Sequence, residues 1–206
     1  MRLSTVLLLG LPLLVACEDV KEDEGEDGHD HNHGLITALE LNFTDSSGST
    51  STFSFSDPTG DGSNTTTDDI VLTAGESYDV SMRVLNQLEE PVEDVTIEID
   101  ELAEEHQFFF TGTAVFGPAS ASQSAVVEHT YNDEDANGLP LGLDNVFVAS
   151  TAGEDTMWVT LRHMPPESSQ DVKVEGLAEA LSASGGDFSV IGGSNDIQKE
   201  FLVTVN

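Results

Sequence analysis

From residue 35 onward, apolar side chains recur at every second position in short segments separated by turn-forming residues. A period of two is typical of half-buried β-strands, because successive side chains point to opposite faces of a sheet. The pattern predicts strands at residues 35–43, 52–56, 70–73, 78–85, 107–111, 125–131, 146–150, 156–163 and 201–205. No alternation of strands with long helices is visible, which argues against a doubly wound α/β fold. We therefore expect residues 35–206 to form a mainly β domain, an antiparallel Ig-like sandwich.

Glycine-containing turns at residues 74–76 and 152–155 each separate two predicted strands. Such turns are typical of β-hairpins, so we expect each pair of flanking strands to be hydrogen-bonded neighbours. The segment 171–184 is ambiguous, and its pattern fits the start of a strand followed by a short helix.

Residues 91–105 break the two-residue rhythm. Apolar side chains there fall at helical spacing, with acidic side chains on the opposite face. Pro91 suits the first turn of a helix, and Glu93 and Asp94 complement the positive end of its dipole. We expect one short acidic helix; a strand through residues 95–99 is the alternative.

The N-terminus has the form of an export signal. Met1 and Arg2 precede an apolar run that is too short to span a bilayer, which takes about 20 residues. Leu14-Val15-Ala16-Cys17 resembles the lipobox of bacterial lipoproteins. The resemblance implies that residues 1–16 are removed and that Cys17 is acylated, giving a membrane anchor of more than one chain. An ordinary cleaved signal is the alternative. Cys17 is the only cysteine, so no intramolecular disulfide can form.

Residues 17–34 are acidic and almost free of apolar side chains, as expected of a disordered tether. The segment 18–23 resembles the acidic export signal of surface-exposed lipoproteins of Bacteroidota-like bacteria. Within the tether, His29, His31 and His33 alternate with Asp30 and Asn32. Imidazoles on a flexible tract can bind zinc, copper or nickel, although a plain polar spacer has the same composition.

The formal net charge is -33, from 39 acidic and 6 basic residues. A field of this sign repels nucleic acid and anionic lipid head groups and attracts cations. The charge therefore excludes a nucleic-acid partner. It is compatible with cation capture, and equally with solubility or life in salty water, where counterions screen the repulsion.

An acidic loop follows the strand at 125–131. Asp133, Asp135 and Asn137 occupy positions one, three and five of an EF-hand-like calcium loop, Gly138 follows at position six, and Asp144 falls at position twelve. A calcium ion is the corresponding expectation. An acidic turn without a metal is the alternative, since a true EF-hand has flanking helices and a longer glutamate at position twelve.

Three further histidines, His106, His129 and His163, lie on predicted regular elements. If they converge, three imidazoles with a carboxylate suit zinc. If they do not, each is an ordinary core or boundary histidine.

The segments 104–110 and 161–163 resemble those of an uncharacterised group of small Bacteroidota-type lipoproteins, over most of the mature domain. Some members carry the automatic label "type 1 periplasmic binding fold". That label implies an α/β fold, which the strand pattern here does not support, and the resemblance implies no activity.

Motifs for catalysis are missing: the chain has no nucleophile elbow, no paired zinc-protease histidines, no phosphate-binding glycine loop and no cysteine nucleophile. We therefore expect a non-enzymatic, lipid-anchored protein of the cell envelope, at the periplasmic or the outer face of the outer membrane. One expectation is a binding module for a divalent metal such as zinc, or for a small ligand, accessory to an outer-membrane receptor. The alternative is a structural or adhesive Ig-like module with a calcium-stabilised loop.

Overall fold

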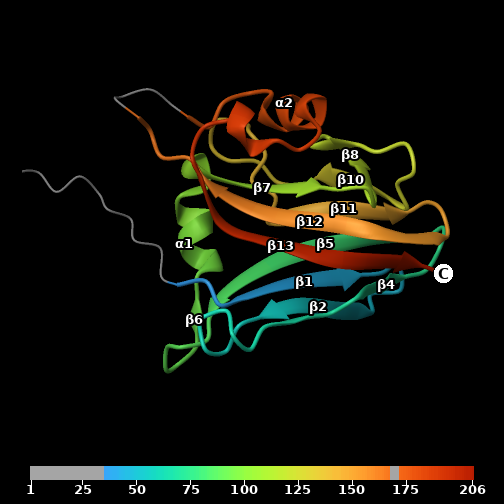
Figure 1. The fold of residues 1–206 in the computed structure, drawn as a ribbon, viewed down its shortest axis with the longest axis horizontal. Coiled ribbons are helices and arrows are strands. Elements are labelled where there is room, and N and C mark those ends of the chain that lie inside the picture. Colours follow the sequence, from blue (N-terminus) through green and yellow to red (C-terminus); the bar gives the residue numbers. More distant parts are fainter. Residues whose placement is uncertain (1–34, 168–171) are drawn as a thin grey trace, which may run out of the picture. The chain divides into compact units, whose positions relative to one another are not determined.

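The computed structural model describes residues 35–167 and 172–206, and its strands form two β-sheets that face each other (Figure 1). The predicted signal segment, Cys17, and the histidines at 29, 31 and 33 lie outside the described residues. No helix among the described residues is long and apolar enough to cross a membrane.

The larger sheet contains nine strands. In spatial order they are β3 (Thr66–Thr67), β2 (Thr50–Ser56), β1 (Ala38–Thr44), β5 (Ser77–Asn86), β11 (Asp144–Ala149), β10 (Val127–Tyr131), β8 (Val115–Gly117) and β9 (Ser120–Ala121), with β6 (Glu93–Asp94) paired to β5. The smaller sheet has the order β4 (Ile70–Leu72), β13 (Ser194–Val205), β12 (Gly153–His163) and β7 (His106–Thr111).

The prediction of a mainly β, two-sheet fold is confirmed, but the finer prediction of an antiparallel Ig-like sandwich is not. The larger sheet curls into a half-barrel. Two strand pairs, β8 with β10 and β4 with β13, run parallel. The structure also contains two α-helices, α1 (Thr96–Glu101) and α2 (Leu177–Ser184), and two short 3₁₀ helices, η1 (Ala103–Glu105) and η2 (Phe188–Val190), where the sequence predicted one helix.

The turns predicted at 74–76 and 152–155 do not close hairpins, and residues 153–155 already belong to β12. Each leads from one sheet to the other, because β4 and β12 belong to the smaller sheet whereas β5 and β11 belong to the larger. The backbone N–H of Gly75 donates to the carbonyl of Ala149, and that of Ala74 donates to Asn206, so the first turn ties the two sheets together. The alternation of side chains says which face of a strand is buried, but not which sheet the strand joins.

The predicted helix at 91–105 is shorter in the structure. Residues 93–94 pair with β5 as β6, and Asp94 accepts a hydrogen bond from Arg83 Nε at 2.9 Å. The helix begins only after this strand, and the backbone N–H of Thr96 donates to Asp94 Oδ1 at 3.2 Å. Ile99 is buried whereas Ile97 is 62% exposed. Residues two apart point to different faces of a helix but to the same face of a strand, so this difference fits the helix and not the alternative strand.

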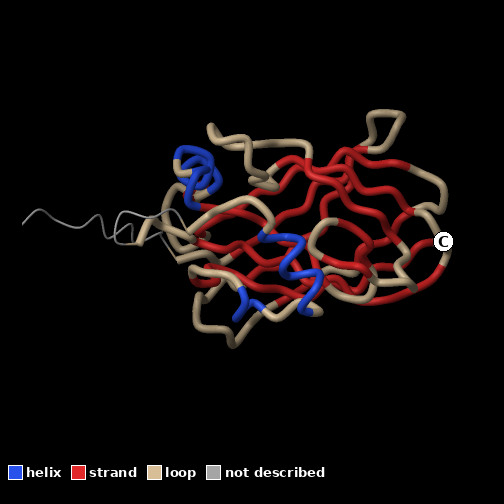
Figure 2. The backbone as a smooth tube through the Cα atoms, turned by 90° about the horizontal axis from the view of Figure 1, so that it is seen from above, coloured by secondary structure: helices blue, strands red, loops and turns tan. Residues whose placement is uncertain are grey.

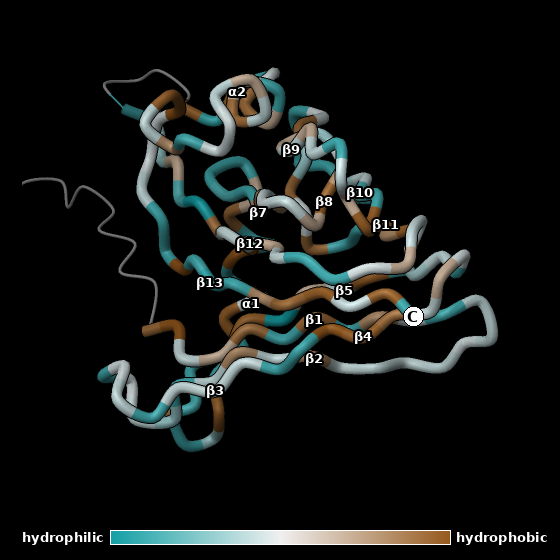
Figure 3. Tube along the Cα trace, turned by 45° about the vertical axis from the view of Figure 1, so that its right-hand side comes forward, coloured by the Kyte–Doolittle hydropathy of each residue, from teal (hydrophilic) through white to brown (hydrophobic). Residues whose placement is uncertain are grey.

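The main core lies between the two sheets. Its largest fully buried side chains include the aromatic rings of Phe43, Phe108, Phe110, Phe147 and Phe201. In Figure 3 apolar stretches lie along the strands and on α2, and hydrophilic stretches lie between them on the same strands as well as on loops. The period-two pattern of the sequence therefore marks the inward faces of both sheets.

A second, smaller core lies on the outer side of the smaller sheet. Phe109 of β7 packs there with Leu177 and Leu181 of α2 and with Ile191. Seen from above in Figure 2, α2 lies over the strands, while α1 lies at one end of them. Strand β7 is thus buried on both of its faces, and all six of its residues are buried.

We predict that Phe110→Ala lowers the free energy of unfolding by about 3–5 kcal/mol, because it opens a cavity between the sheets. Phe110 is fully buried, and its ring centroid lies 5.2 Å from that of Phe147. Urea denaturation measures the loss. The matched control is Phe116→Ala, since Phe116 is 47% exposed; its effect should stay within about 0.5 kcal/mol. Equal losses in both variants would contradict this description of the core.

Candidate metal site

Two of the three predicted histidines meet where β7 and β12 lie side by side. His106 is the first residue of β7 and His163 the last of β12, and they are direct partners in this antiparallel pair. Their rings stack with centroids 4.8 Å apart and planes within 7°. His106 is fully buried and the side chain of His163 is 15% exposed, so the pair lies at the rim of the core.

A β-bulge brings a carboxylate to this pair. Along β13, Ile197 pairs with Leu161 but the next partner of β12, Arg162, pairs with Asn195. Asp196 is therefore an extra residue in β13, and a bulge of this kind re-aims a side chain. The Oδ2 atom of Asp196 lies 3.8 Å from His106 Nε2. One ligand atom each from His106, His163 and Asp196 lies within 4.8 Å of the others.

Arg162 holds the segment that leads into the bulge. Its side chain is on the opposite face of β12 from His163, since neighbours in a strand alternate. The guanidinium donates to five oxygen atoms: the carbonyls of Phe188, Ile191, Gly192 and Gly193 and the side chain of Asn195. Burial lowers the pKa of Arg162, against an opposing effect of Asp196. These bonds fix residues 188–195, and with them the place of Asp196.

Gly193 lets this segment approach β12 closely. Its φ is +79°, and an added Cβ atom would lie 2.2 Å from the carbonyl oxygen of His163. Only glycine fits both the backbone conformation and the space.

A backbone carbonyl sets the tautomer of His106. Its Nδ1 lies 2.9 Å from the carbonyl oxygen of Leu102. A carbonyl oxygen only accepts, so Nδ1 carries the hydrogen and donates it. In the neutral ring, Nε2 then offers its lone pair toward Asp196. The same arrangement, with one ring nitrogen held by a carbonyl, orients histidine ligands in metal sites.

Glu105 adds a second carboxylate. Its Oε2 lies 3.5 Å from His163 Nε2, and its side chain is 20% exposed. The cluster therefore contains two imidazoles and two carboxylates, from η1, β7, β12 and β13. In a tetrahedral zinc site, ligand atoms lie about 3.3 Å apart, because zinc–ligand bonds are about 2.0–2.1 Å long. The donor set suits zinc, but parallel rings do not aim both lone pairs at one point. One of the two rings has to rotate before both can bind the same ion. His163 is the less buried of the two, so it is the ring that we expect to rotate.

His129 lies elsewhere, so the expected convergence of three histidines is limited to two. Its Nε2 donates to Asn145 Oδ1 at 2.9 Å, and its ring packs against Phe110, Tyr131 and Phe147. Its Nδ1 is buried with no hydrogen-bond partner among the described residues. His129 extends from the larger sheet into the main core and meets β7 at Phe110, four residues along the strand from His106. It therefore lies away from the histidine pair.

The carboxylates of the predicted calcium loop already have protein partners. Asp133 accepts hydrogen bonds from the backbone N–H groups of Gly142, Leu143 and Asp144 at 2.7–2.9 Å. Asp135 Oδ1 accepts from the backbone of Asn137 and Leu139. The side chains of Asn137 and Asp144 are exposed. Calcium binding by Asp133, Asp135, Asn137 and Asp144 stays a prediction that these contacts do not favour.

Lys173 is the partner of the second carboxylate oxygen of Asp135. Its Nζ is 2.7 Å from Asp135 Oδ2 and donates to the carbonyl of Ala103 at 2.8 Å. Both side chains are almost completely buried. Burial works to raise the pKa of Asp135, but the hydrogen bonds from Lys173, Leu139 and Asn137 and the charge of Lys173 together outweigh it, and the pKa is lowered. The ammonium group thus supplies the positive charge that the loop carboxylate needs.

The sequence missed Asp196 and Glu105 as members of the site. In the sequence, Asp196 is one acidic residue among many, and no neighbouring residue indicates that a β-bulge occurs at this position. Glu105 directly precedes His106 in the sequence, and its side chain lies beside His163 because His163 is the strand partner of His106.

Comparisons with protein-family models, with curated proteins and with solved structures gave no match to this chain.

We predict that His129 makes the domain less stable as the pH falls from about 6.5 to about 4. Burial lowers the pKa of His129 from 6.5 to about 4, against a smaller opposing effect of Asn145. Between these two pH values His129 is protonated in the unfolded chain but neutral in the folded protein, so the free energy of unfolding falls by roughly 3 kcal/mol. The difference in unfolding free energy between wild type and His129→Gln should therefore shrink on acidification. A difference that is constant with pH would contradict the assignment.

Proposed function

We propose that this chain is a lipid-anchored binding module of the cell envelope that holds a divalent transition-metal ion, with zinc the best fit, between His106, His163 and Asp196. The observation that carries the proposal is that these side chains come from three strands and that one ligand atom of each lies within 4.8 Å of the others. Glu105 lies beside this group, with its Oε2 atom 3.5 Å from His163 Nε2, but its oxygen is not among the three ligand atoms that lie within 4.8 Å of one another.

The ligand types favour zinc over calcium or magnesium. Imidazole nitrogen suits zinc, copper, iron and nickel, whereas calcium and magnesium prefer oxygen alone. The backbone carbonyl of Leu102 holds His106 in the tautomer that a metal needs. Rotation of His163 about its side-chain bonds completes the geometry.

The envelope setting follows from the sequence. Acylation of Cys17 would hold the module at a membrane, and the histidines of the tether would bind the same metals loosely, since a flexible tract has to be ordered on binding. The negative field attracts cations to the module. Transfer of the ion to an outer-membrane receptor is the role that fits this arrangement. The competing adhesive function rests on calcium in the loop at 133–144, and the protein contacts of Asp133 and Asp135 weigh against it.

Zinc titration tests the metal site. The parent protein is the full chain carrying Cys17→Ser, His29→Ala, His31→Ala and His33→Ala, which removes every other thiol and tether ligand. Competition with a chelating dye measures its zinc affinity. We expect Asp196→Asn to weaken binding at least tenfold, because it removes a charged ligand while keeping the size of the side chain. The affinity of the parent should also fall as the pH drops through about 6.5, where imidazole takes up a proton.

Asp69→Asn is the matched control, because Asp69 is exposed and distant in the sequence from the cluster. It should leave zinc affinity unchanged. Parent and Asp196→Asn proteins with equal affinity would exclude the proposed site. Calcium binding that Asp135→Ala abolishes, without any zinc binding, would support the adhesive alternative.

Incorporation of labelled fatty acid tests the anchor. We expect the wild-type chain to take up the label in a bacterial host with lipoprotein processing, and Cys17→Ser to take up none, because the thiol of Cys17 is the acceptor in the lipobox. Labelling of both proteins to the same extent would rule out acylation at this residue.

A further inference from the structure

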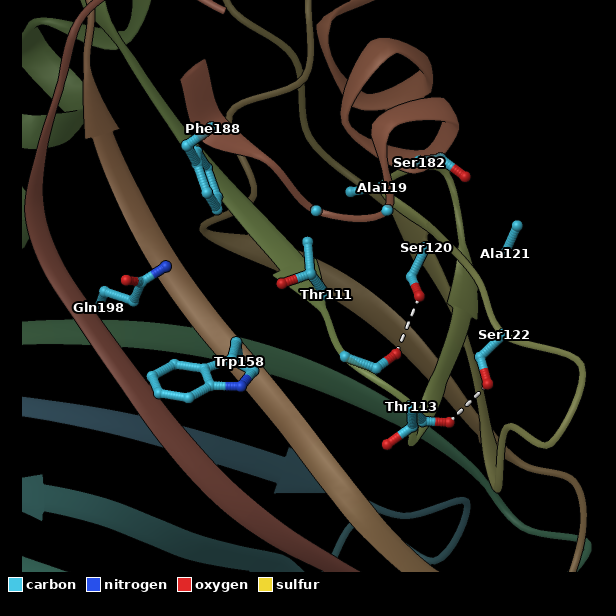
Figure 4. Close-up of a pocket in the computed structure, with 13 residues that line it drawn as sticks. Thr111, Thr113, Ala119, Ser120, Ala121, Ser122, Trp158, Ser182, Phe188 and Gln198 are labelled. Carbon is cyan, nitrogen blue, oxygen red and sulfur yellow. Dashed lines mark hydrogen bonds between the residues drawn. The ribbon is translucent and has the colours of Figure 1, made fainter. Parts of the chain in front are cut away.

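A groove lies on the outer side of the smaller sheet, at the opposite end of β7 from the histidine pair. Its floor is formed by β7, β12 and β13, and its walls by the end of α2, by η2 and by the segment around β9 (Figure 4). Its volume is about 570 Å³, within the range of about 300–1,000 Å³ that is usual for small-molecule sites. The helix α2 and the second core cover the sheet beside it and leave this part open.

The lining carries no charged side chain. It consists of serine, threonine, glycine and alanine residues with Trp158, Phe188 and Gln198. This neutrality is unexpected in a chain with a net charge of -33. An anionic ligand would find no cation here, and a cationic ligand would find no carboxylate. The groove therefore selects for a neutral ligand.

Aromatic faces are available at two positions. Trp158 points outward from β12 and is 36% exposed. Phe188 is fixed in place by Phe109 in an edge-on contact at 5.8 Å and by the guanidinium of Arg162 at 5.4 Å. Figure 4 shows the two rings at separate places along the groove, with Thr111 and Gln198 in the stretch between them. Indole presents a large, rigid surface that binds at low entropic cost.

The polar groups are held as hydrogen-bond acceptors. Ser120 Oγ donates to the carbonyl of Gly112 at 2.9 Å, and Ser122 Oγ donates to the carbonyl of Thr113 at 2.7 Å. Each hydroxyl therefore donates its hydrogen to a backbone carbonyl, and its oxygen can accept a hydrogen bond from a ligand. The Nε2 of Gln198 donates to Thr160 Oγ1 at 3.0 Å, which orients the amide. A ligand rich in O–H donors complements these oriented acceptors.

We propose that this groove binds a neutral oligosaccharide, with the C–H face of one sugar ring stacked on Trp158 and its hydroxyls donating to Gln198 and to the serines of the β9 segment. Sugars combine an apolar ring face with a rim of hydroxyl donors, and this is the combination that the lining complements. The site is separate from the histidine cluster, so the inference stands or falls independently of metal binding. A neutral peptide is less suitable, because β9 in the wall of the groove is only two residues long and offers a peptide little edge for strand pairing.

Trp158 is the only tryptophan of the chain, so its fluorescence reports on this groove alone. The test titrates the full-length protein with neutral gluco-, manno-, xylo- and N-acetylchito-oligosaccharides at millimolar concentration. We expect at least one of them to shift or quench the emission in a saturable way. Gln198→Ala should weaken that binding about tenfold, since it removes an oriented hydrogen-bonding group. Trp158→Ala, followed by calorimetry, should abolish it.

Gln123→Ala is the control, because Gln123 is an exposed glutamine outside the groove. It should bind as the wild type does. The proposal is overturned if none of the sugars changes the emission, or if Gln123→Ala weakens binding as much as Gln198→Ala. It is also overturned if acidic oligosaccharides such as oligogalacturonate, or a neutral serine-rich peptide, bind Trp158 more tightly than every neutral sugar.

Discussion

The structure depends on the burial of β7. This strand is at the edge of the smaller sheet, yet all six of its residues are buried. Phe108 and Phe110 point into the space between the sheets, and Phe109 points into the outer core under α2. A strand with three consecutive aromatic rings needs cover on both faces, and the curled sheet and the helix α2 provide it. The two ends of β7 lie at the edges of these covering elements. His106 at one end belongs to the histidine cluster, and Thr111 at the other end lines the neutral groove.

Most strands could be predicted from the sequence because a two-residue period is a local property. The face that carries Met157, Val159 and Leu161 is buried as their spacing indicates. Two kinds of information are not local. The first is the choice of sheet, which made the turn at 74–76 a crossing between the two sheets. The second is register: Asp196 joins the cluster only because β13 gains one residue relative to β12. The loop at 133–144 shows a further limit, because its acidic spacing fits calcium although Lys173, far along the chain, lies against Asp135.

In the part of the chain that the structure describes, each basic side chain makes a specific contact with the protein. Arg83 pairs with Asp94, Arg162 binds a row of carbonyls, and Lys173 binds Asp135. Lys199 lies 3.7 Å from the centre of the Phe55 ring. Their positive charges are therefore used to hold loops and strands rather than to balance the surface. With 39 acidic and 6 basic residues the net charge remains strongly negative, and a field of this sign attracts cations.

The bulge in β13 also bears on how such a site can arise. Strand pairing on either side of Asp196 is regular, so the sheet is complete without this residue. A single codon gained at this point would add a carboxylate beside two stacked imidazoles and leave every other partner in register. A site assembled in this way needs no new loop and no redesign of the core. Closely similar domains could therefore differ in having or lacking the cluster through the insertion or deletion of one amino acid.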